Sequence, residues 1–315
     1  MKVTIIGGSG VVGASTGYRL AQDGHASEIL LVDVRRNLAE AHALDIEQAV
    51  VHRAATRVRA GDIEDTVDSD VIVLAASVPR HSFEHSRREY LAENLPLVFD
   101  MVDPIHTRSP SALWIVATLP VDPLVYLIHR AFSIPRENLI GLNRNDTSRF
   151  RWAIARTLSV PTTAVEAFVL GEHGETQVPI FSRIRIHGES VSLKPDQINQ
   201  IQSDISSFFL KWNKLQPGRT AGWTTAESMG DIISSMVSED GKIWVCATCL
   251  EGEYGLKEVS LGVPIRLSSG RVKEIIEFNL NPAERKAFEA SAASIREMIE
   301  EGQVLLKRTK GHKPQ

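Results

Sequence analysis

The chain opens with the stretch VTIIGGSGVVG, residues 3–13, which joins a β-branched run to a glycine-rich turn. Residues 3–6 are typical of a buried strand, and residues 11–24 have helical character. The glycines fit G-x-G-x-x-G or G-x-x-G-x-x-G, depending on where the pattern starts; they are Gly7, Gly8, Gly10 and Gly13. This order predicts a turn whose backbone approaches a phosphate group closely, with helix N–H groups facing the negative charge.

An acidic residue follows at the distance that a dinucleotide site requires. Asp33 lies 20 residues beyond Gly13, at the end of the strand-like run 28–33. There a carboxylate holds the ribose hydroxyls of NAD and repels the 2′-phosphate of NADP. The prediction is an NAD site. Two alternatives stay open: a purely structural glycine turn with Asp33 as a helix cap, and attraction of the 2′-phosphate by Arg35 and Arg36.

Strand-like and helix-like segments alternate as far as residue 143. The runs 70–76, 112–116 and 138–140 are almost wholly apolar, as in parallel sheets covered by helices on both faces. We therefore predict a doubly wound parallel (Rossmann) sheet, α/β in class, for residues 1–143. An α+β substrate domain is expected over residues 144–315. Its predicted elements are strands at 165–170, 178–186, 243–250 and 259–267, a helix at 196–215, and a closing helix capped by Asn281 that frays from Lys307.

Composition restricts the class of protein. The 315 residues are 43% hydrophobic and 23% charged, which is enough for a large core without disulfides or metals. A net charge of -4 argues against nucleic-acid and anionic-membrane partners, and two cysteines argue against a secreted disulfide scaffold. The first apolar run is short for a signal peptide, and no window approaches the roughly 20 apolar residues of a membrane helix. A cytoplasmic location is expected.

Residues able to carry acid–base chemistry lie in the second half. His173 follows a strand within Gly-Glu-His-Gly-Glu, and imidazole exchanges protons near neutrality. Asp146 and Arg149 are three residues apart, on one face of a predicted helix. Such an Asp could orient the imidazole, and such an Arg could bind a substrate carboxylate bidentately. Arg80 and Arg87 follow an earlier strand, where loops of parallel sheets bind ligands.

With these residues the chain resembles the lactate/malate dehydrogenase family over nearly its whole length, and the 27-residue interval from Asp146 to His173 matches the family spacing. The turn 252–255 and residues 256–258 look closest to the malate dehydrogenases of the lactate-dehydrogenase-like branch. The resemblance implies an NAD-dependent 2-hydroxy acid dehydrogenase that favours a malate-like dicarboxylate and forms a homodimer or homotetramer. The motifs that occur in the family's order are the glycine turn, Asp33, Pro79-Arg80, Pro120-Val121-Asp122, residues 146–151, residues 171–174 and Gly262-Val263-Pro264.

The resemblance also implies a role for each matching residue. His173 would be the general acid/base, Asp146 would orient it, and Arg87 would polarise the carbonyl. Arg149 and Arg80 would bind the two carboxylates, while the loop between Arg80 and Arg87 closes over substrate. The NAD site would consist of Gly7, Gly8, Gly10, Val12, Gly13, Asp33, Asn94, Val116 and Thr118.

The sequence departs from the family pattern at three places. Leu119 stands where the family has an Asn that bonds the substrate oxygen, so this substrate-side position carries no polar group. The two loop arginines are seven residues apart, without glycine. With an insertion, Arg80 keeps the specificity position; without one, His81 takes it. Arg80 is favoured because Pro79 leads into it. Asn143 replaces the glycines that commonly precede the Asp-bearing helix.

Two other functions are alternatives. The first is an NAD-binding sensor or partner protein with weak catalysis, which Leu119 and the altered loop suggest. The second is an NAD-dependent glycosidase of related fold, whose family holds a metal with Cys and His. Cys246 and Cys249 have no nearby His in sequence, and their odd offset in a strand places the thiols on opposite faces. No metal site is expected.

Overall fold

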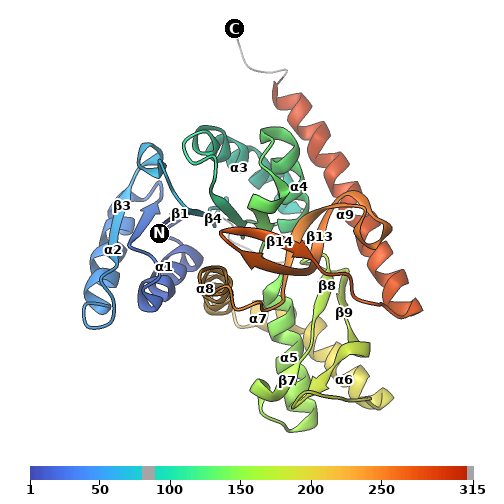
Figure 1. Ribbon diagram of the computed structural model, residues 1–315. Helices are drawn as coiled ribbons and strands as arrows, with labels where there is room; N and C mark the ends of the chain where they lie inside the picture. Colours follow the sequence, from blue (N-terminus) through green and yellow to red (C-terminus); the bar gives the residue numbers. More distant parts are fainter. Residues whose placement is uncertain (80–88, 311–315) are drawn as a thin grey trace.

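The computed structural model describes residues 1–79 and 89–310, and Figure 1 shows how their elements are arranged. In the first half, six strands form a parallel sheet in the order β3-β2-β1-β4-β5-β6. This is the strand order of the Rossmann fold, so the predicted doubly wound sheet is confirmed. The strands are β1 (Lys2–Ile6), β2 (Glu28–Val32), β3 (Arg57–Gly61), β4 (Val71–Leu74), β5 (Leu113–Val116) and β6 (Leu139–Gly141).

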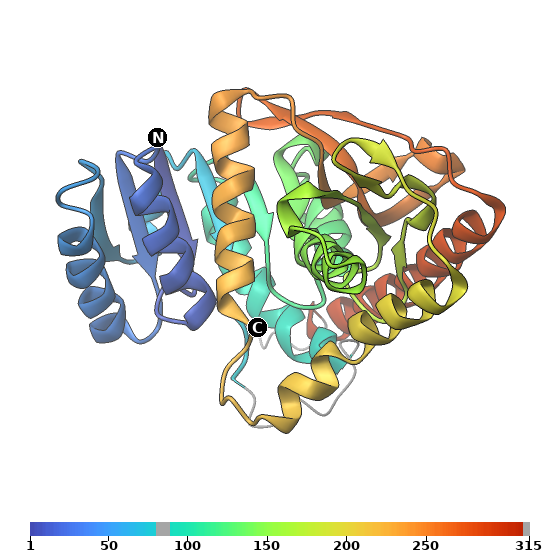
Figure 2. The ribbon, with the colours of Figure 1, turned by 90° about the horizontal axis from the view of Figure 1, so that it is seen from below.

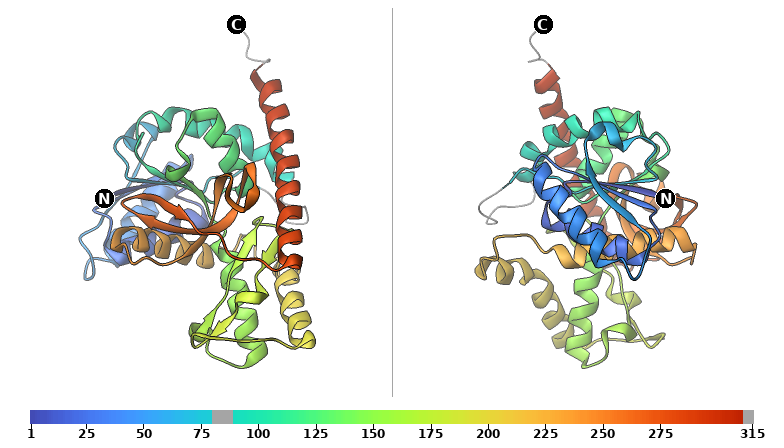
Figure 3. Two further views of the ribbon diagram at one scale, coloured as in Figure 1. Left: turned by 45° about the vertical axis from the view of Figure 1, so that its right-hand side comes forward. Right: turned by 90° about the vertical axis from the view of Figure 1, so that its left-hand side faces the viewer.

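Helices cover both faces of this sheet. In the right-hand view of Figure 3 the strands lie between α1 and α2 below and α3 and α4 above. The central strands β4 and β5 are wholly buried, which explains why their sequences are continuously apolar. Their parallel pairing brings their carboxyl ends to one edge of the sheet. The helices are α1 (Val11–Asp23), α2 (Arg36–Ala49), α3 (Tyr90–His106) and α4 (Val121–Phe132).

The sheet continues into the second half of the chain. Ala247 of β12 (Trp244–Glu251) pairs with Gly141 of β6, and the antiparallel order β12-β13-β8-β9 follows. One large apolar core therefore runs through both halves. A smaller core lies under α5 and α6. The remaining strands of this region are β7 (Val165–Glu166), β8 (Val169–Gly171), β9 (Gln177–Pro179), β10 (Arg185–Ile186), β11 (Glu189–Ser190), β13 (Lys257–Ser268) and β14 (Arg271–Ile275).

The helices of the second half lie around these strands. Figures 1 and 2 show α8 running beside α1, with which it is in contact. The closing helix α9 begins as predicted: the Asn281 side chain accepts the N–H of Glu284, whose carboxylate accepts the N–H of Asn281. The helices are α5 (Arg144–Leu158), α6 (Pro195–Ser206), α7 (Phe208–Lys214), α8 (Gly222–Ser238) and α9 (Pro282–Lys310).

Four predictions for the second half are wrong in detail. The runs 165–170 and 178–186 are each broken into two short strands. Residue Ile180 belongs to the large core and Ile184 to the small one, so the chain has to turn between them. The predicted helix 196–215 bends at Ser207, which separates α6 from α7. The tail does not fray from Lys307, because α9 continues to Lys310.

Among the residues that the structure describes, no helix has the length and apolar character needed to cross a membrane.

Candidate active site

The glycine turn is pressed against neighbouring strands so closely that side chains would not fit. A Cβ at Gly7, whose φ is +89°, would lie 2.6 Å from the backbone N of Ala76. One at Gly13 would lie 2.2 Å from the carbonyl oxygen of Gly7. Gly10 differs, because its Cβ would meet only that same carbonyl oxygen, at 3.4 Å. The turn is therefore packed on the sheet side and open at the N-terminus of α1. This cradle fits a pyrophosphate group.

Asp33 lies directly after β2 and braces the glycine turn. Its carboxylate accepts the backbone N–H groups of Ser9 at 3.0 Å and Arg35 at 2.9 Å. Burial acts to raise the pKa of Asp33, but these hydrogen bonds outweigh it and lower the pKa below its usual value. The Arg35 guanidinium lies 3.8 Å from Asp33 and that of Arg36 is paired with Glu40 and Asp62. An ionised carboxylate thus stands where the ribose of NAD is expected.

The other predicted cofactor residues lie at the end of β5, on α3 beside the ends of β4 and β5, and at the start of α1. Val116 ends β5 and is buried, and the Thr118 hydroxyl donates to the carbonyl oxygen of Ala76 at 2.7 Å. Asn94 of α3 forms hydrogen bonds to backbone groups with both the oxygen and the nitrogen of its side-chain amide. Its oxygen accepts the N–H of Val78 at 2.9 Å, and its nitrogen donates to the carbonyl oxygen of Leu119 at 2.7 Å. Val12 lies in the first turn of α1. Thr118 and Asn94 thus bind the segments that follow β4 and β5, and Ala76, which accepts from Thr118, packs against Gly7.

The structure brings His173 and Asp146 into contact. Nδ1 of His173 lies 2.5 Å from Oδ2 of Asp146, and both side chains are buried. Asp146 is in the first turn of α5, and Arg149, one turn later, donates to its Oδ1 at 2.9 Å. The guanidinium of Arg149 also stacks on the ring of Phe208, 4.5 Å from its centroid. A carboxylate beside Nδ1 fixes the ring and stabilises its protonated form.

Two further buried residues lie beside this pair, and residue type and spacing alone do not identify them. Asp122 accepts the backbone N–H of His173 at 2.7 Å and the side-chain amide of Asn143 at 2.9 Å. Burial raises the pKa of Asp122 to about 7, opposed by these two hydrogen bonds and reinforced by the carboxylates of Glu172 and Asp146. The signals were present, since Asp122 ends a recognised motif and Asn143 is a departure from the family. Neither signal revealed that the two side chains meet.

Leu119 precedes α4 and joins Pro120 through a cis peptide bond. Its half-buried side chain packs against the large core, and its carbonyl oxygen accepts the Asn94 amide. Leu119 thus contributes a backbone acceptor and an apolar side chain. Three further candidates, Arg80, His81 and Arg87, lie outside the described residues, so their roles stay predictions.

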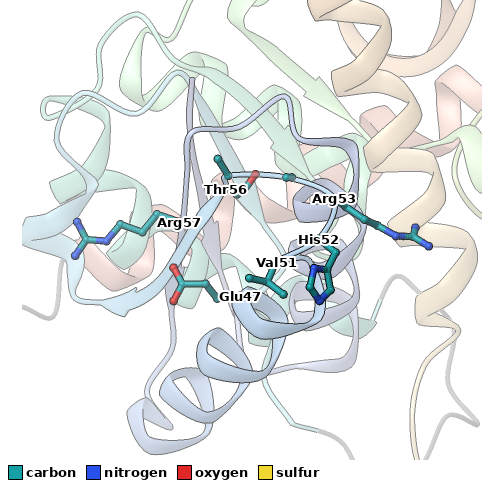
Figure 4. Close-up of a pocket in the computed structure, with 8 residues that line it drawn as sticks. Glu47, Val51, His52, Arg53, Thr56 and Arg57 are labelled. Atoms are coloured by element: carbon teal, nitrogen blue, oxygen red, sulfur yellow. The ribbon is translucent and has the colours of Figure 1, made fainter.

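A separate hollow of about 610 Å³ lies where α2 leads into β3, and Figure 4 shows its lining. Arg53 and Arg57 point in opposite directions there, and His52 turns away from both. The carboxylate of Glu47 accepts the N–H of Val58. Because its cations diverge, this hollow does not form an anion site, and none of its lining residues belongs to the candidate active site.

Comparison with known proteins places the chain in a family. Residues 1–141 match the family model for the lactate/malate dehydrogenase NAD binding domain, and residues 144–305 match that for the lactate/malate dehydrogenase alpha/beta C-terminal domain. The chain is 35% identical to the malate dehydrogenase of Chloroherpeton thalassium, covering 95% of this chain and 98% of that protein. It is 31% identical to that of Halobacterium salinarum, covering 95% and 99%.

A solved structure agrees with these relatives. Malate dehydrogenase from Salinibacter ruber superposes with a TM-score of 0.90 at 29% identity, covering 98% of this chain and all of that one. The described residues hold no group of three or more side chains suited to a metal ion. The fold, the glycine cradle and the buried His–Asp pair agree with the family match: the chain belongs to the lactate/malate dehydrogenase family of NAD-dependent 2-hydroxy acid dehydrogenases.

Proposed function

We propose that the chain interconverts a 2-hydroxy acid and its 2-keto acid with NAD, and that a malate-like dicarboxylate is the favoured substrate class. The observation that carries this proposal is the buried His173–Asp146 pair at 2.5 Å with Arg149 on the next helical turn. Malate dehydrogenases of about 30% identity over most of the chain support the dicarboxylate. The intact pair argues against the weakly catalytic sensor, which no described feature favours.

In the proposed mechanism His173 moves the proton. Its Nδ1–H donates to Asp146, and Nε2 takes the hydroxyl proton during oxidation and returns it during reduction. Asp146 stays ionised and stabilises the imidazolium that forms. When bound in the first half of the chain, NAD would supply the hydride acceptor for the carbon that bears the hydroxyl. Burial of His173 and Asp146 keeps water from competing for the proton.

Arginines bind and polarise the substrate in this proposal. Arg149 binds the C1 carboxylate, and the ring of Phe208 stacked on its guanidinium restricts its orientation. Arg80 binds the second carboxylate, and Arg87 stabilises negative charge on the carbonyl oxygen. Leu119 lies on the substrate side, where its apolar side chain alters the fit of the reacting oxygen.

The cofactor is held by the first half of the chain. The cradle at Gly7, Gly8, Gly10 and Gly13 supports pyrophosphate binding at the start of α1, because Gly7, Gly8 and Gly13 have no room for side chains and Gly10 leaves the helix N-terminus open. Asp33 accepts the ribose hydroxyls and disfavours NADP. Val12, Asn94, Val116 and Thr118 line the remaining path toward the nicotinamide.

The test is NADH oxidation against a panel of 2-keto acids: oxaloacetate, pyruvate, and bulkier or differently charged analogues. We expect turnover with at least one member, and weaker turnover with NADPH in place of NADH. An enzyme that binds NADH and turns over none of the panel would contradict the proposal.

Assembly, location and domain boundary complete the proposal. We propose a homodimer or homotetramer, supported by exposed apolar side chains on three helices: Tyr18 of α1, Leu44 of α2 and Trp223 of α8. Light scattering after size exclusion tests it. The free thiols of both cysteines support a cytoplasmic site of action. The proposed boundary at residues 143/144 is supported by the start of α5 at Arg144.

A further inference from the structure

Asp122 is a buried carboxylate that holds the backbone of the catalytic loop. It follows Leu119 and Pro120 in the first turn of α4, and it is 1% exposed. Its Oδ2 accepts the N–H of His173 at 2.7 Å. The ring of the same His173 is held by Asp146, on α5. His173 is therefore fixed at two points, one on its backbone and one on its imidazole, from two different helices.

Asn143 connects this carboxylate to three other elements. It is 2% exposed, and its Nδ2 donates to Oδ1 of Asp122 at 2.9 Å. Its Oδ1 accepts the N–H of Ala247 in β12 at 3.0 Å. Its backbone carbonyl accepts the N–H of Asp146 at 3.1 Å, at the start of α5. Its Nδ2 also approaches the carbonyl oxygen of Gly171, at 3.3 Å, two residues before His173.

The orientation of the Asn143 amide is fixed by its partners. A flipped amide would turn its NH₂ toward the N–H of Ala247, and its oxygen toward the carboxylate of Asp122. Both contacts are repulsive in a buried site. Space is equally restricted, since a Cβ at Gly262 would lie 2.8 Å from Nδ2 of Asn143. Gly262 thus leaves the room that the Asn143 side chain occupies.

We infer that Asp122 and Asn143 act together as positioning residues for His173, setting where Nε2 of its ring lies relative to substrate. The inference rests on the proposed function. Asn143 precedes the helix that carries Asp146 and Arg149, and Asp122 follows the Leu119–Pro120 segment. The pair therefore ties the proton carrier to both sides of the substrate site. Misplacing a catalytic group by about 1 Å can cost on the order of 100-fold in rate.

The first test is Asp122→Asn. The Asn side chain can still accept from the N–H of His173, but its NH₂ then meets the NH₂ of Asn143. We expect kcat to fall about 10- to 100-fold, with little change in KM or in NADH affinity. Asp240→Asn is the matched control, because Asp240 also accepts a backbone N–H, from Lys242, far from the site. It should leave kcat unchanged.

The decisive variant exchanges the two side chains. In Asp122→Asn with Asn143→Asp, the NH₂ of the new Asn donates to the new carboxylate, which accepts the N–H of Ala247. Every hydrogen bond between a donor and an acceptor is restored, except the contact of residue 143 with the carbonyl oxygen of Gly171. We expect the double variant to recover at least about tenfold of the lost kcat, a coupling that independent structural damage does not produce. Equal kcat in wild type and Asp122→Asn, or no recovery on exchange, overturns the inference.

Asn143→Gly covers the case in which Asp122→Asn does not fold. It keeps the bond from His173 to Asp122 and removes the link to β12, and we expect a fall in kcat of about tenfold with KM nearly unchanged. Wild-type kcat in this variant also overturns the inference. A wild type without turnover on any 2-keto acid would instead contradict the proposed function.

A ring titration gives a readout that does not depend on substrate. With selectively labelled histidine, NMR reports the pKa of the His173 imidazole. The charged groups that act on Asp122 are the carboxylates of Glu172 and Asp146, and the His173 backbone N–H donates to it. Where Asp122 is ionised, removing its negative charge should lower the pKa of His173, and the exchange should reverse most of the change. An identical titration in all variants overturns the inference even in an inactive protein.

Discussion

At the scale of single residues, His173 carries the proposed proton transfer. We expect His173→Ala to lower kcat by ~10²–10⁴, because general acid–base help is lost, while NADH binds almost normally. Binding should survive because the glycine cradle lies in the first half of the chain. Stopped-flow turnover and fluorescence titration with NADH measure the two effects. His52→Ala, in the remote hollow of Figure 4, is the control. Unchanged turnover in His173→Ala would remove this residue from the mechanism.

The second prediction concerns the cofactor preference set by Asp33. Asp33→Ser should raise NADPH affinity, because the carboxylate that repels a 2′-phosphate is gone and Arg35 lies beside the vacated position. Affinity for NADH should fall at the same time. Titration of both cofactors measures the switch, with Asp100→Ser on the exposed side of α3 as the control. A wild type that already binds NADPH more tightly than NADH would show that Asp33 is wrongly assigned.

The third prediction concerns Leu119. We expect oxaloacetate to be at best a mediocre substrate of the wild type. Leu119 offers only an apolar side chain where the family's Asn bonds the reacting oxygen. The loss of one such bond costs on the order of 1–3 kcal/mol, or roughly 5- to 150-fold in rate. Leu119→Asn should therefore raise kcat/KM for oxaloacetate, and the exposed Leu215→Asn should not.

The activity of Leu119→Asn with different 2-keto acids separates two explanations for the presence of Leu119. A gain with oxaloacetate and a loss with another 2-keto acid would indicate a different natural substrate. A gain alone would indicate partial decay. Ordinary malate-dehydrogenase efficiency in the wild type would contradict the prediction and make Leu119 a tolerated replacement.

Residue type and spacing were sufficient to find the pair of His173 and Asp146, because one lies after a strand and the other in a helix at the family interval. They were not sufficient for Asp122 and Asn143. Those two side chains are 21 positions apart and meet only because α4 and α5 begin side by side at the end of the sheet. A contact set by tertiary packing leaves no local pattern.

At the scale of elements, α7 carries a stack of aromatic rings that begins at Arg149. The Phe208 ring lies under the guanidinium of Arg149 and stacks on Trp212, with ring centroids 6.1 Å apart and planes inclined by 22°. The next layer is Arg219, whose guanidinium lies 5.5 Å from the Trp212 ring centroid. We infer that this stack limits the motion of Arg149.

The fourth prediction follows from that stack. Phe208→Leu should raise KM for the 2-keto acid roughly 2- to 10-fold and change kcat less, because a cation–π contact of about 0.5–1.5 kcal/mol is lost. Trp152→Leu is a matched control further along α5, where Arg156 stacks on the exposed Trp152 ring. A KM that rises equally in both variants would show that the effect is not specific to Arg149.

Helices and strands whose ends are marked by local sequence signals could be predicted from the sequence. Segments whose residues are buried in two different cores could not. The first helix begins after the glycine turn and ends at Gly24, in the left-handed conformation, as its sequence indicates. The run 178–186 reads as one strand because its apolar residues are continuous. The structure breaks it because Ile180 and Ile184 are buried in different cores. The pattern of apolar residues in a sequence indicates which residues are buried. It does not indicate in which of two cores each residue is buried.

At the scale of the whole molecule, the buried carboxyl of Asp122 couples stability to pH. Burial raises its pKa to about 7, while an unfolded chain has a value near 3.9. Between these values the folded chain holds a proton that the unfolded chain has released. The stabilisation is complete below about pH 4 and is lost as pH rises through about 7, on the order of 4 kcal/mol in all.

This is the fifth prediction, and chemical denaturation at pH 5 and pH 8 tests it. The free energy of unfolding of the wild type should fall more between these pH values than that of Asp122→Asn, which has no proton to lose there. Comparing the change with pH removes any general destabilisation by the substitution. Parallel changes in the two proteins would show that Asp122 does not titrate in this range.

The continuous sheet has a consequence for engineering. Gly141 of β6 faces Ala247 of β12 so closely that a Cβ at Gly141 would lie 2.9 Å from that of Ala247, and Asn143 binds the same Ala247 through its side chain. A chimera that joins the first half of this chain to the second half of a relative must therefore match small residues on both strands. Without that match, the exchanged halves should pair incorrectly where β6 meets β12. This failure is expected even though each half keeps its own functional residues.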